Sequence, residues 1–360
     1  MAKTYKAGAI GRTGKGNYGH GLHLAYKGLD NVEFIAVADP DEAGREKAKA
    51  DTGAIRAYSD YSEMLEKEDL DIVSVCPRWV DCHLKMLLAC IDAGCHIYCE
   101  KPMVASLEDG DKILESAERA ELKIAVAHQG VYLPGIQIIK RMLNEGKIGE
   151  VQAIYGHGKQ DSRGGGEDMI VLGTHLFNMM RYFVGDVDWM FAHVTSQGHD
   201  ITPNDVREAT EPVGLIAGDC INSYFSFKSG VAGFFDSRKD QIGSDKRYGM
   251  DIVGSQGMIS LRGGTASSVA LYPYPVSSPH DLSQKWEPLK IDNTPLQNGN
   301  QLAIINLIDS IENNRKPISS GYDAVLALEM ILGAYESQIS KGRVPFPMKN
   351  RKHPLEIFCK

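Results

Sequence analysis

A glycine-rich stretch near the amino terminus has the residue types and spacing of a loop that binds a dinucleotide. Gly14, Gly16 and Gly19 satisfy the three-glycine pattern of such loops. Glycines allow backbone amides to approach a pyrophosphate closely where a helix begins. Asp39 lies 20 residues after Gly19, at the offset of the carboxylate that binds the adenosine ribose. The residues expected to contact the cofactor here are Gly11, Arg12, Thr13, Gly14, Gly16, Asn17, Tyr18, Gly19 and Asp39.

Two other interpretations of this stretch stay open. A glycine-rich turn without any ligand would show the same spacing, although the strand, helix and acid expected around it favour a nucleotide site. Arg12 is placed to reach a 2′-phosphate, whereas Asp39 at the end of a strand favours a free ribose. The sequence therefore predicts NAD as the cofactor, with NADP as the less favoured choice.

A second candidate site is Cys99-Glu100-Lys101-Pro102, which directly follows a predicted parallel strand. Ligands bind at the carboxyl edge of doubly wound sheets, so a lysine there would face the nicotinamide. The positive charge of the oxidised ring and partial burial would both favour the neutral amine, which is the form that accepts a proton. A Glu-Lys-Pro triplet alone is more often a solvated turn, so this assignment depends on its surroundings.

The elements that would position these residues alternate short apolar runs with amphipathic helices, which is typical of βαβ units and a parallel sheet. A first helix is expected directly after the glycine-rich loop. Further helices are expected at about residues 41–50, 60–65, 81–93 and 106–120, with capping residues at their starts. Strands are expected at residues 5–10, 32–38, 72–76, 96–99 and 124–127.

After a helix at residues 134–144 the pattern changes to longer β-like runs. Further helices are expected at about 168–183, 301–313 and 322–340, and strands at 151–158, 187–195, 221–227, 231–235, 249–253 and 258–261. The chain is therefore predicted to be an α/β protein. A Rossmann domain with a doubly wound parallel sheet would span residues 1–128. An α+β domain with a large, mostly antiparallel open sheet would span 129–360, for substrate binding and oligomerisation, and its last helix is a candidate to pack back on the first domain.

Composition and charge exclude several classes of protein. The 360-residue chain has a formal net charge of −8 and no dense run of Lys and Arg, so the basic face that nucleic-acid binding requires is missing. No stretch reaches the ~18 consecutive apolar residues of a membrane helix, and no signal peptide is evident. The seven cysteines lack the spacing of zinc modules and are expected to be thiols, so no metal site is predicted. We expect a cytoplasmic protein that binds neither nucleic acid nor membranes.

The order of these features along nearly the whole chain resembles the Gfo/Idh/MocA family of oxidoreductases. In that family the lysine of the Glu-Lys-Pro triplet serves the hydride-transfer site, and the following peptide bond is often cis, so the resemblance assigns these features to Lys101 and Pro102. A family segment near the nicotinamide, typically Asn/Thr-Pro-Asn followed by a histidine, corresponds here to Cys76-Pro77-Arg78-Trp79 with His83, in which Arg78 and Trp79 depart from the usual residues. The additional cofactor contacts expected are Pro77, Arg78, Trp79, His83, Glu100, Lys101 and Gln129.

The segment around His175 resembles the family helix Asp-x-Gly-x-His-x-x-Asp, whose histidine is an acid/base candidate beside the substrate hydroxyl. Here Val171 and Asn178 occupy the positions of the two acids. Asp168 precedes His175 by two turns on the same face of a regular α-helix, so we expect it to replace the missing carboxylate. A buried structural histidine is the alternative for His175. The residues expected to bind the substrate are Lys101, Tyr132, Lys159, Arg163, Asp168 and His175.

These observations predict an NAD-dependent dehydrogenase acting on the secondary hydroxyl or ketone of a sugar, polyol or glycoside. Lys101 and His175 would share the proton transfer, with Asp168 as a third catalytic residue. Two alternatives with the same fold stay open: a glycosidase that retains NAD and uses transient oxidation, and a cofactor-sensing regulatory protein without turnover. The resemblance also implies self-association as a homodimer or homotetramer.

Overall fold

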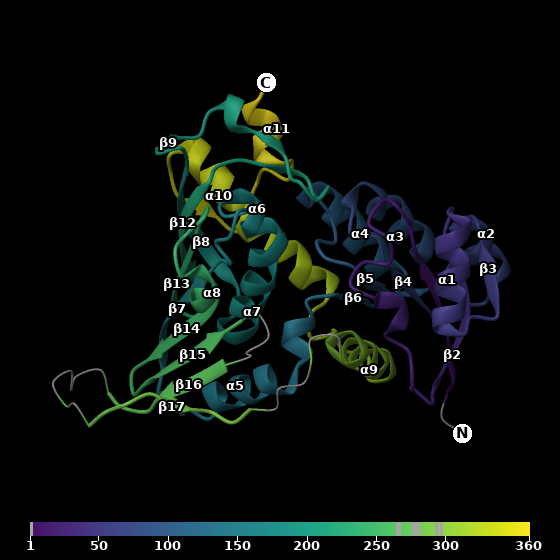
Figure 1. Ribbon diagram of the computed structural model, residues 1–360, viewed down its shortest axis with the longest axis horizontal. Helices are drawn as coiled ribbons and strands as arrows, with labels where there is room; N and C mark the ends of the chain where they lie inside the picture. The colour runs from purple at the N-terminus through teal and green to yellow at the C-terminus, as the bar shows by residue number, and fades with distance from the viewer. Residues whose placement is uncertain (1–2, 264–267, 276–280, 282, 292–294, 296–297) are drawn as a thin grey trace. The chain divides into compact units, whose positions relative to one another are not determined.

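The computed structural model describes residues 3–263, 268–275, 281, 283–291, 295 and 298–360 (Figure 1). Contacts divide the chain into two compact units. The first unit comprises Met1–Gln129, Glu211–Gly214 and Pro295–Val325, and the second comprises Gly130–Thr210, Leu215–Thr294 and Leu326–Lys360. Each unit is described by itself.

A six-stranded sheet forms the centre of the first unit, in the order β3-β2-β1-β4-β5-β6, and neighbouring strands are parallel. The strand order reverses between β1 and β4, and such sheets bind ligands at the carboxyl edge beside that point. This arrangement confirms the predicted Rossmann fold. The strands are β1 (Tyr5–Ile10), β2 (Val32–Ala38), β3 (Arg56–Tyr58), β4 (Ile72–Val75), β5 (His96–Cys99) and β6 (Ile124–Val126).

Capped helices connect these strands. Asp41 accepts a hydrogen bond from the amide of Gly44 at the start of one helix, and Ser106 accepts one from the amide of Asp109 at the start of another. A helix from far along the chain also belongs to this unit and packs against β6. The helices are α1 (Glu42–Thr52), α2 (Tyr61–Lys67), α3 (His83–Asp92) with the 3-10 turn η2 (Val80–Cys82) before it, α4 (Leu107–Arg119) and α9 (Asn298–Glu312).

The structure differs from the sequence-based expectation after β1. The described residues between the glycine-rich loop and β2 contain no α-helix. The 3-10 turn η1 (Leu22–Leu24) and a series of turns lead to β2 instead. Gly19 and Gly21 have φ values of 57° and 80°, in the left-handed region that interrupts a right-handed helix. The prediction of a helix here is therefore wrong, and the amides of the loop itself are the groups left to hold a pyrophosphate.

A ten-stranded sheet dominates the second unit, in the order β17-β16-β15-β14-β7-β13-β12-β8-β18, with β9 paired to β8. Among its described strands, only β7 and β13 pair in parallel, so the predicted mostly antiparallel sheet is confirmed. A separate hairpin pairs β10 (Arg207–Glu208) with β11 (Leu215–Ile216). The strands of the large sheet are β7 (Val151–His157), β8 (Val187–Ser196), β9 (His199–Asp200), β12 (Cys220–Phe227), β13 (Ala232–Arg238), β14 (Gly249–Gly254), β15 (Met258–Arg262), β16 (Ser268–Tyr272), β17 (Glu287–Pro288) and β18 (Val344–Pro345).

Helices cover one face of this sheet (Figure 1). Phe177 of α7 packs against Phe235, with ring centroids 4.7 Å apart, and the hydroxyl of Ser337 in α10 accepts a hydrogen bond from the amide of Ala192 at 2.9 Å. The boundary between the units falls inside α10. The remaining helices and turns are η3 (Gln129–Tyr132), α5 (Pro134–Asn144), α6 (Gly166–Asp168), the π-helical turn η4 (Met169–Gly173), α7 (Thr174–Val184), η5 (Pro203–Asp205), α8 (Ser244–Arg247), α10 (Gly321–Ser340) and α11 (Pro354–Phe358).

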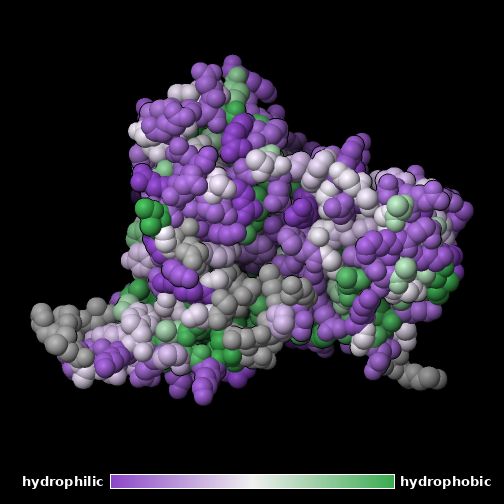
Figure 2. Space-filling model, in the orientation of Figure 1, coloured by the Kyte–Doolittle hydropathy of each residue, from purple (hydrophilic) through white to green (hydrophobic). Residues whose placement is uncertain are grey.

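A row of aromatic residues crosses the opposite face of the sheet. Phe191, Tyr224, Phe234 and Tyr155 are successive cross-strand neighbours on β8, β12, β13 and β7. The rings of Tyr155 and Phe234 stack with centroids 4.7 Å apart, and Phe191 is 46% exposed. Elsewhere, on the face of the molecule shown in Figure 2, hydrophilic residues predominate. Within the described part of the chain, no helix combines the length and apolar character needed to cross a membrane.

Candidate functional site

The glycine-rich loop of the first unit is held largely by hydrogen bonds to itself. The amide of Arg12 donates to the carbonyl of Asn17 at 3.1 Å, and the amide of Asn17 donates back to the carbonyl of Arg12 at 3.0 Å. The side-chain oxygen of Asn17 accepts a third hydrogen bond, from the amide of Gly14 at 2.9 Å. Asn17 has a φ of 51°, which asparagine adopts more readily than most residues. Its side chain therefore shapes the loop.

Part of the loop remains available to an anion. Gly14 has a φ of 80°, and a Cβ built on it would have no atom within 4 Å. Among the described residues, no protein group accepts a hydrogen bond from the amide of Gly16 or Tyr18. Open glycines with unpaired amides are the pattern by which loops bind phosphate groups. The loop therefore fits the pyrophosphate of a dinucleotide.

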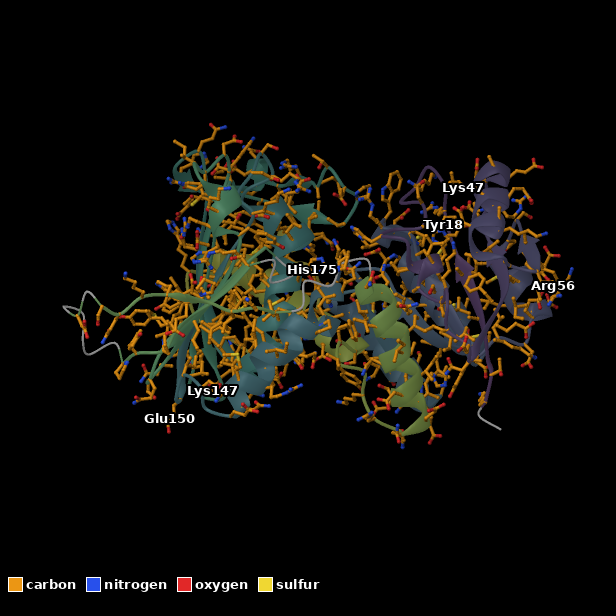
Figure 3. All side chains as sticks on the ribbon, turned by 60° about the horizontal axis from the view of Figure 1, so that its bottom comes forward. Tyr18, Lys47, Arg56, Lys147, Glu150 and His175 are labelled. Carbon is orange, nitrogen blue, oxygen red and sulfur yellow. The ribbon has the colours of Figure 1, made fainter. Side chains whose placement is uncertain are left out.

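Tyr18, labelled in Figure 3, packs its ring against Gly11 of this loop. It is 8% exposed, and its ring lies 4.5 Å from that of His23 between centroids. A Cβ on Gly11 would lie 2.2 Å from the Tyr18 ring, so only glycine fits there. Burial raises the pKa of the Tyr18 phenol and lowers the pKa of His23 to about 4. Gly11 and Tyr18 thus support the loop by packing.

Asp39 lies at the end of β2 and is 1% exposed. Its carboxylate accepts hydrogen bonds from the hydroxyl of Thr13 at 2.8 Å, from the amide of Thr13 at 3.1 Å and from the amide of Asp41 at 3.0 Å. The structure therefore brings the expected ribose-binding acid against the glycine-rich loop. Thr13, expected to contact the cofactor, fixes Asp39 in place.

A cavity of about 230 Å³ lies beside Asp39, where β1, β2 and β3 end. This is the edge at which doubly wound sheets bind the adenosine half of a dinucleotide. Sequence reasoning missed several lining residues because β3 is short and was not predicted, so no strand end marked them. A larger cavity of about 530 Å³ lies at the opposite edge, where β5 and β6 begin. The lining of the smaller cavity is Ile10, Gly11, Arg12, Ala38, Asp39, Pro40, Ser59, Asp60, Tyr61 and Met86.

His83 joins two segments of the predicted nicotinamide site. It is fully buried, and its Nε2 lies 2.7 Å from the carbonyl oxygen of Pro77, while its Nδ1 lies 3.0 Å from the carbonyl oxygen of Met103. Both ring nitrogens therefore face protein carbonyls. His83 ties the turn after β4 to the segment that follows Lys101, so it acts by positioning them.

The backbone of Arg78 and Trp79 closes over the glycine-rich loop. The amide of Arg78 donates to the carbonyl of Gly16 at 3.2 Å. A Cβ on Gly16 would lie 2.5 Å from the amide nitrogen of Arg78 and 2.7 Å from that of Trp79, so this close approach requires glycine. The guanidinium of Arg78 lies 3.7 Å from the carboxylate of Glu211, in the segment that returns to the first unit. Arg78 and Trp79 are thus adjacent to the loop.

Glu100 and Lys101 are buried directly after β5, and the peptide bond between Lys101 and Pro102 is cis. Glu100 Oε2 accepts a hydrogen bond from the amide of His20 at 2.9 Å and lies 2.9 Å from Nδ1 of the same residue. Burial raises the pKa of the Glu100 carboxyl, but the hydrogen bonds from His20 and the electrostatic interactions with His20 and Lys101 outweigh burial, so the pKa is lowered. A Cβ on Gly19 would lie 2.3 Å from Oε2, so Gly19 makes room for this carboxylate.

His175 lies in the first turn of α7 (Figure 3). Its neighbours Thr174 and Leu176 are buried, whereas His175 is partly exposed. The π-helical turn η4 precedes it directly. Such turns are rare and often occur at functional sites, because they change which side chains share a helix face. The helix therefore presents His175 at its surface.

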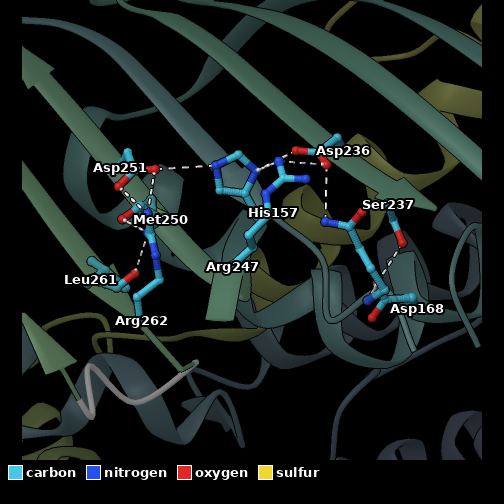
Figure 4. A network of polar contacts seen from close by, with 10 residues as sticks. His157, Asp168, Asp236, Ser237, Arg247, Met250, Asp251, Leu261 and Arg262 are labelled. Atoms are coloured by element: carbon cyan, nitrogen blue, oxygen red, sulfur yellow. Dashed lines mark hydrogen bonds and ion pairs between the residues drawn. The ribbon is translucent and has the colours of Figure 1, made fainter. Parts of the chain in front are cut away.

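Asp168 has partners other than the expected one (Figure 4). Its carboxylate is buried and accepts hydrogen bonds from the amides of Lys159 at 3.2 Å and Gln160 at 3.0 Å, and from the hydroxyl of Ser237 at 2.6 Å. A π turn uses more residues per turn than an α-helix, so the seven-residue spacing no longer places Asp168 and His175 on one face. Burial raises the pKa of Asp168, partly offset by these hydrogen bonds. Asp168 fixes the end of β7 and does not pair with His175.

The other expected substrate-binding residues of the second unit form a charged cluster after β7. The carboxylate of Asp161 lies 3.2 Å from Nζ of Lys159 and 3.1 Å from Nη2 of Arg163. Burial raises the pKa of Asp161, but the hydrogen bonds from Arg163 and Lys159 lower it to about 2. Two further predicted residues, Gln129 and Tyr132, are 3% and 5% exposed in the η3 turn.

All seven cysteines are free thiols. In the portion of the chain that the structure describes, no three His, Cys, Asp or Glu side chains come together as metal ligands would.

Comparison with known proteins identifies the family. Residues 7–128 match the oxidoreductase family with an NAD-binding Rossmann fold, and residues 140–346 match the C-terminal alpha/beta domain of that family. The chain is 27% identical to the myo-inositol 2-dehydrogenase of Thermotoga maritima over 69% of this chain and 74% of that protein. It is 25% identical to the D-apiose dehydrogenase of Paraburkholderia graminis over 88% of this chain and 83% of that protein.

The fold is also similar to that of an oxidoreductase from Agrobacterium radiobacter whose crystal structure contains NAD+. The TM-score is 0.73 at 18% identity, covering 95% of this chain and 98% of the other. The chain belongs to the Gfo/Idh/MocA family of oxidoreductases, with an NAD-binding Rossmann domain followed by the C-terminal α/β domain of that family.

Proposed function

We propose that this protein is an NAD-dependent dehydrogenase that transfers a hydride between the nicotinamide and a secondary hydroxyl or ketone carbon of a sugar or polyol. The observation that carries this proposal is the buried Glu100-Lys101 pair, which follows β5 at the same sheet edge as Asp39 and its cavity. The similarity to an inositol dehydrogenase and an apiose dehydrogenase supports a polyhydroxylated substrate. Bound NAD would supply the hydride acceptor or donor.

Residues of the first unit would hold the cofactor. Asp39, fixed by Thr13, would accept hydrogen bonds from the adenosine ribose. The amides of Gly16 and Tyr18 would donate to the pyrophosphate over the open surface of Gly14. We assign residues 1–128 to cofactor binding and residues 129–360 to substrate binding. The segment Pro295–Val325 belongs by contacts to the first unit and would support the cofactor domain.

Lys101 and His175 would carry the proton. When a hydride leaves the carbinol carbon, the hydroxyl must lose its proton to a base. We assign Lys101 to binding and polarising this hydroxyl, with the negative charge of Glu100 beside it offsetting the charge of the ammonium group. His175 is partly exposed and would exchange the proton with solvent. Asp168 would contribute by positioning the segment after β7.

The remaining assignments concern the surroundings of this reaction. Lys159, Arg163 and Tyr132 would contact hydroxyls of the substrate.

The seven free thiols suit a reducing compartment, and we propose that the protein acts in the cytoplasm. The aromatic row on the face of the large sheet opposite the helices would be buried against a second copy of the chain in a homodimer or homotetramer. Light scattering measures the number of copies.

The test is the absorbance of reduced nicotinamide when the purified protein is mixed with NAD or NADP and a panel of sugars, polyols and sugar acids. NADH should form with at least one substrate. Lys101→Ala should lower kcat by about 10²–10⁴-fold, because the group that handles the hydroxyl proton is lost. The affinity for NAD, measured by calorimetry, should change much less.

The matched control is Lys112→Ala, which removes an exposed lysine that pairs with Glu108 on the outer face of α4. This variant should keep the wild-type kcat. NAD binding without NADH formation from any substrate would contradict a dehydrogenase. A Lys101→Ala variant with wild-type kcat would contradict the assigned role of that lysine.

A further inference from the structure

Arg12 is the positively charged residue that lines the cavity beside Asp39, where we propose that adenosine binds. A neighbouring carboxylate pairs with its guanidinium. Of the residues that line this cavity, Arg12 alone carries a positive charge. Its Nη1 lies 2.9 Å from each carboxylate oxygen of Asp81, which sits in the η2 turn. The Arg12 side chain is 23% exposed and that of Asp81 is 55% exposed, so the pair lies at the edge of the cavity.

The charges around this cavity disfavour a phosphate group. Asp39 and Asp60 are both among the lining residues, and the charge of Arg12 is offset by Asp81. A 2′-phosphate would bring a charge of about −1.5 to −2 into these surroundings. Arginine is the side chain that accommodates such a phosphate, because its planar guanidinium donates two parallel hydrogen bonds. Here the guanidinium is already engaged.

The backbone would allow the Arg12 side chain to turn without disturbing the loop. Both backbone hydrogen bonds between Arg12 and Asn17 hold the main chain, independently of the guanidinium. Asp81 accepts no other hydrogen bond from the described residues, and its partner in the ion pair is the side chain of Arg12 alone. Asp81 is therefore the charged partner that directs the guanidinium, beside the thiol of Cys82 as a second side-chain neighbour.

We propose that Asp81 is a specificity-determining residue, which maintains the preference for NAD over NADP by holding Arg12 in an ion pair. This inference rests on the proposed function, because it requires a dinucleotide in the cavity beside Asp39. Removing the charge of Asp81 frees the Arg12 guanidinium to bind a 2′-phosphate. Asp81 acts through Arg12, so it is a positioning residue.

The experiment measures dissociation constants for NAD and NADP by calorimetry with the purified full-length protein. Asp81→Asn should raise the affinity for NADP relative to NAD at least tenfold, which corresponds to about 1.4 kcal/mol. The double variant Asp81→Asn with Arg12→Gln should lose this gain, because the phosphate then has no guanidinium to bind. Asp81→Ser should reproduce the effect if Asp81→Asn folds poorly.

The matched control is Asp51→Asn, which breaks an exposed ion pair with Lys47 on α1 and should leave the ratio unchanged (Figure 3). An unchanged ratio in both Asp81 variants would overturn the inference. A gain that persists without Arg12 would also overturn it, because general charge would then explain the effect. Failure of the wild-type protein to bind either dinucleotide would instead refute the proposed function itself.

Discussion

Asp39 in the first unit and Asp168 in the second have nearly the same hydrogen bonds but different surroundings. Each buried carboxylate accepts hydrogen bonds from two backbone amides and one hydroxyl. Asp39 lines a cavity of about 230 Å³. Against Asp168, in contrast, the chain packs so closely that a Cβ on Gly158 would lie 2.2 Å from its Oδ2. One arrangement leaves the acid accessible to a ligand, and the other closes it off.

The comparison shows that burial and hydrogen bonding alone do not identify a ligand-binding acid. Asp39 follows a strand at the carboxyl edge of a parallel sheet, where neighbouring strand ends leave a crevice. Asp168 precedes a π-helical turn and closes the end of β7. The place of the acid in the fold distinguishes the two.

The largest expected effects come from replacing each acid by its amide. Asp168→Asn puts an NH2 group against enclosed donors and should lower the free energy of unfolding by about 3 kcal/mol. Asp39→Asn should cost only about 1 kcal/mol, because water can enter its cavity, but should weaken NAD binding at least tenfold. Urea unfolding and calorimetry measure the two quantities. If Asp168→Asn weakened NAD binding more than Asp39→Asn did, the conclusion that Asp39 is the ligand-binding acid would be wrong.

Replacing a glycine near each acid tests the same difference between Asp39 and Asp168, with smaller expected effects. Gly158→Ala should destabilise the protein by about 2 kcal/mol, because the new methyl group overlaps the Asp168 carboxylate. Gly14→Ala should cost about 1 kcal/mol for its φ of 80°, since no atom lies within 4 Å of the methyl position. Gly14→Ala should nevertheless be the variant that weakens NAD binding. Equal NAD affinities in the two variants would show that Gly14 is not part of the phosphate site.

The smallest expected effect is a pH dependence that belongs to the Asp168 region. Gln160 connects Asp168 to Asp236 through a hydrogen bond of 3.1 Å, and Asp236 pairs with His157 (Figure 4). Asp251 lies 3.3 Å from the other ring nitrogen of His157. Burial lowers the pKa of His157, but the two carboxylates outweigh burial and raise it above 6.5.

Because the pKa of His157 is higher in the folded than in the unfolded state, its contribution to stability is complete below pH 6.5 and is lost as the pH rises through the folded-state pKa. Wild-type protein should therefore lose about 1 kcal/mol relative to His157→Gln between pH 6 and pH 9. Urea unfolding of both proteins across this range checks the prediction. A parallel decline in the two proteins would remove His157 as its source.

Much of the fold could be predicted because apolar runs and turn residues agree. β1, β2, β5 and α5 have the bounds expected from the sequence, since each apolar run is bounded by turn or capping residues. β3 was missed because Arg56–Tyr58 is short and partly exposed. Without it, the carboxyl-edge rule did not point to Ser59, Asp60 and Tyr61 in the cavity beside Asp39.

The candidate site could be predicted where it depends on strand ends, and less well where it depends on helices. The Glu100-Lys101 segment and Asp39 follow strands, so their places at the sheet edge were predictable. The expected helix after the glycine-rich loop is interrupted at Gly19 and Gly21. The expected partnership of Asp168 with His175 assumed a regular α-helix, and residue spacing alone does not reveal a π turn.

The self-contained hydrogen bonding of the glycine-rich loop has a consequence for the rate at which cofactor exchanges. The backbone groups of Arg12, Asn17 and Gly14 form hydrogen bonds within the loop, and Thr13 bonds to Asp39. A loop that is ordered before its ligand arrives gives up little conformational entropy on association and needs no unfolding for release. We therefore expect the dinucleotide to bind and dissociate in each turnover, as a co-substrate does. The ratio of oxidised to reduced nicotinamide in the surroundings would then set the direction of the reaction.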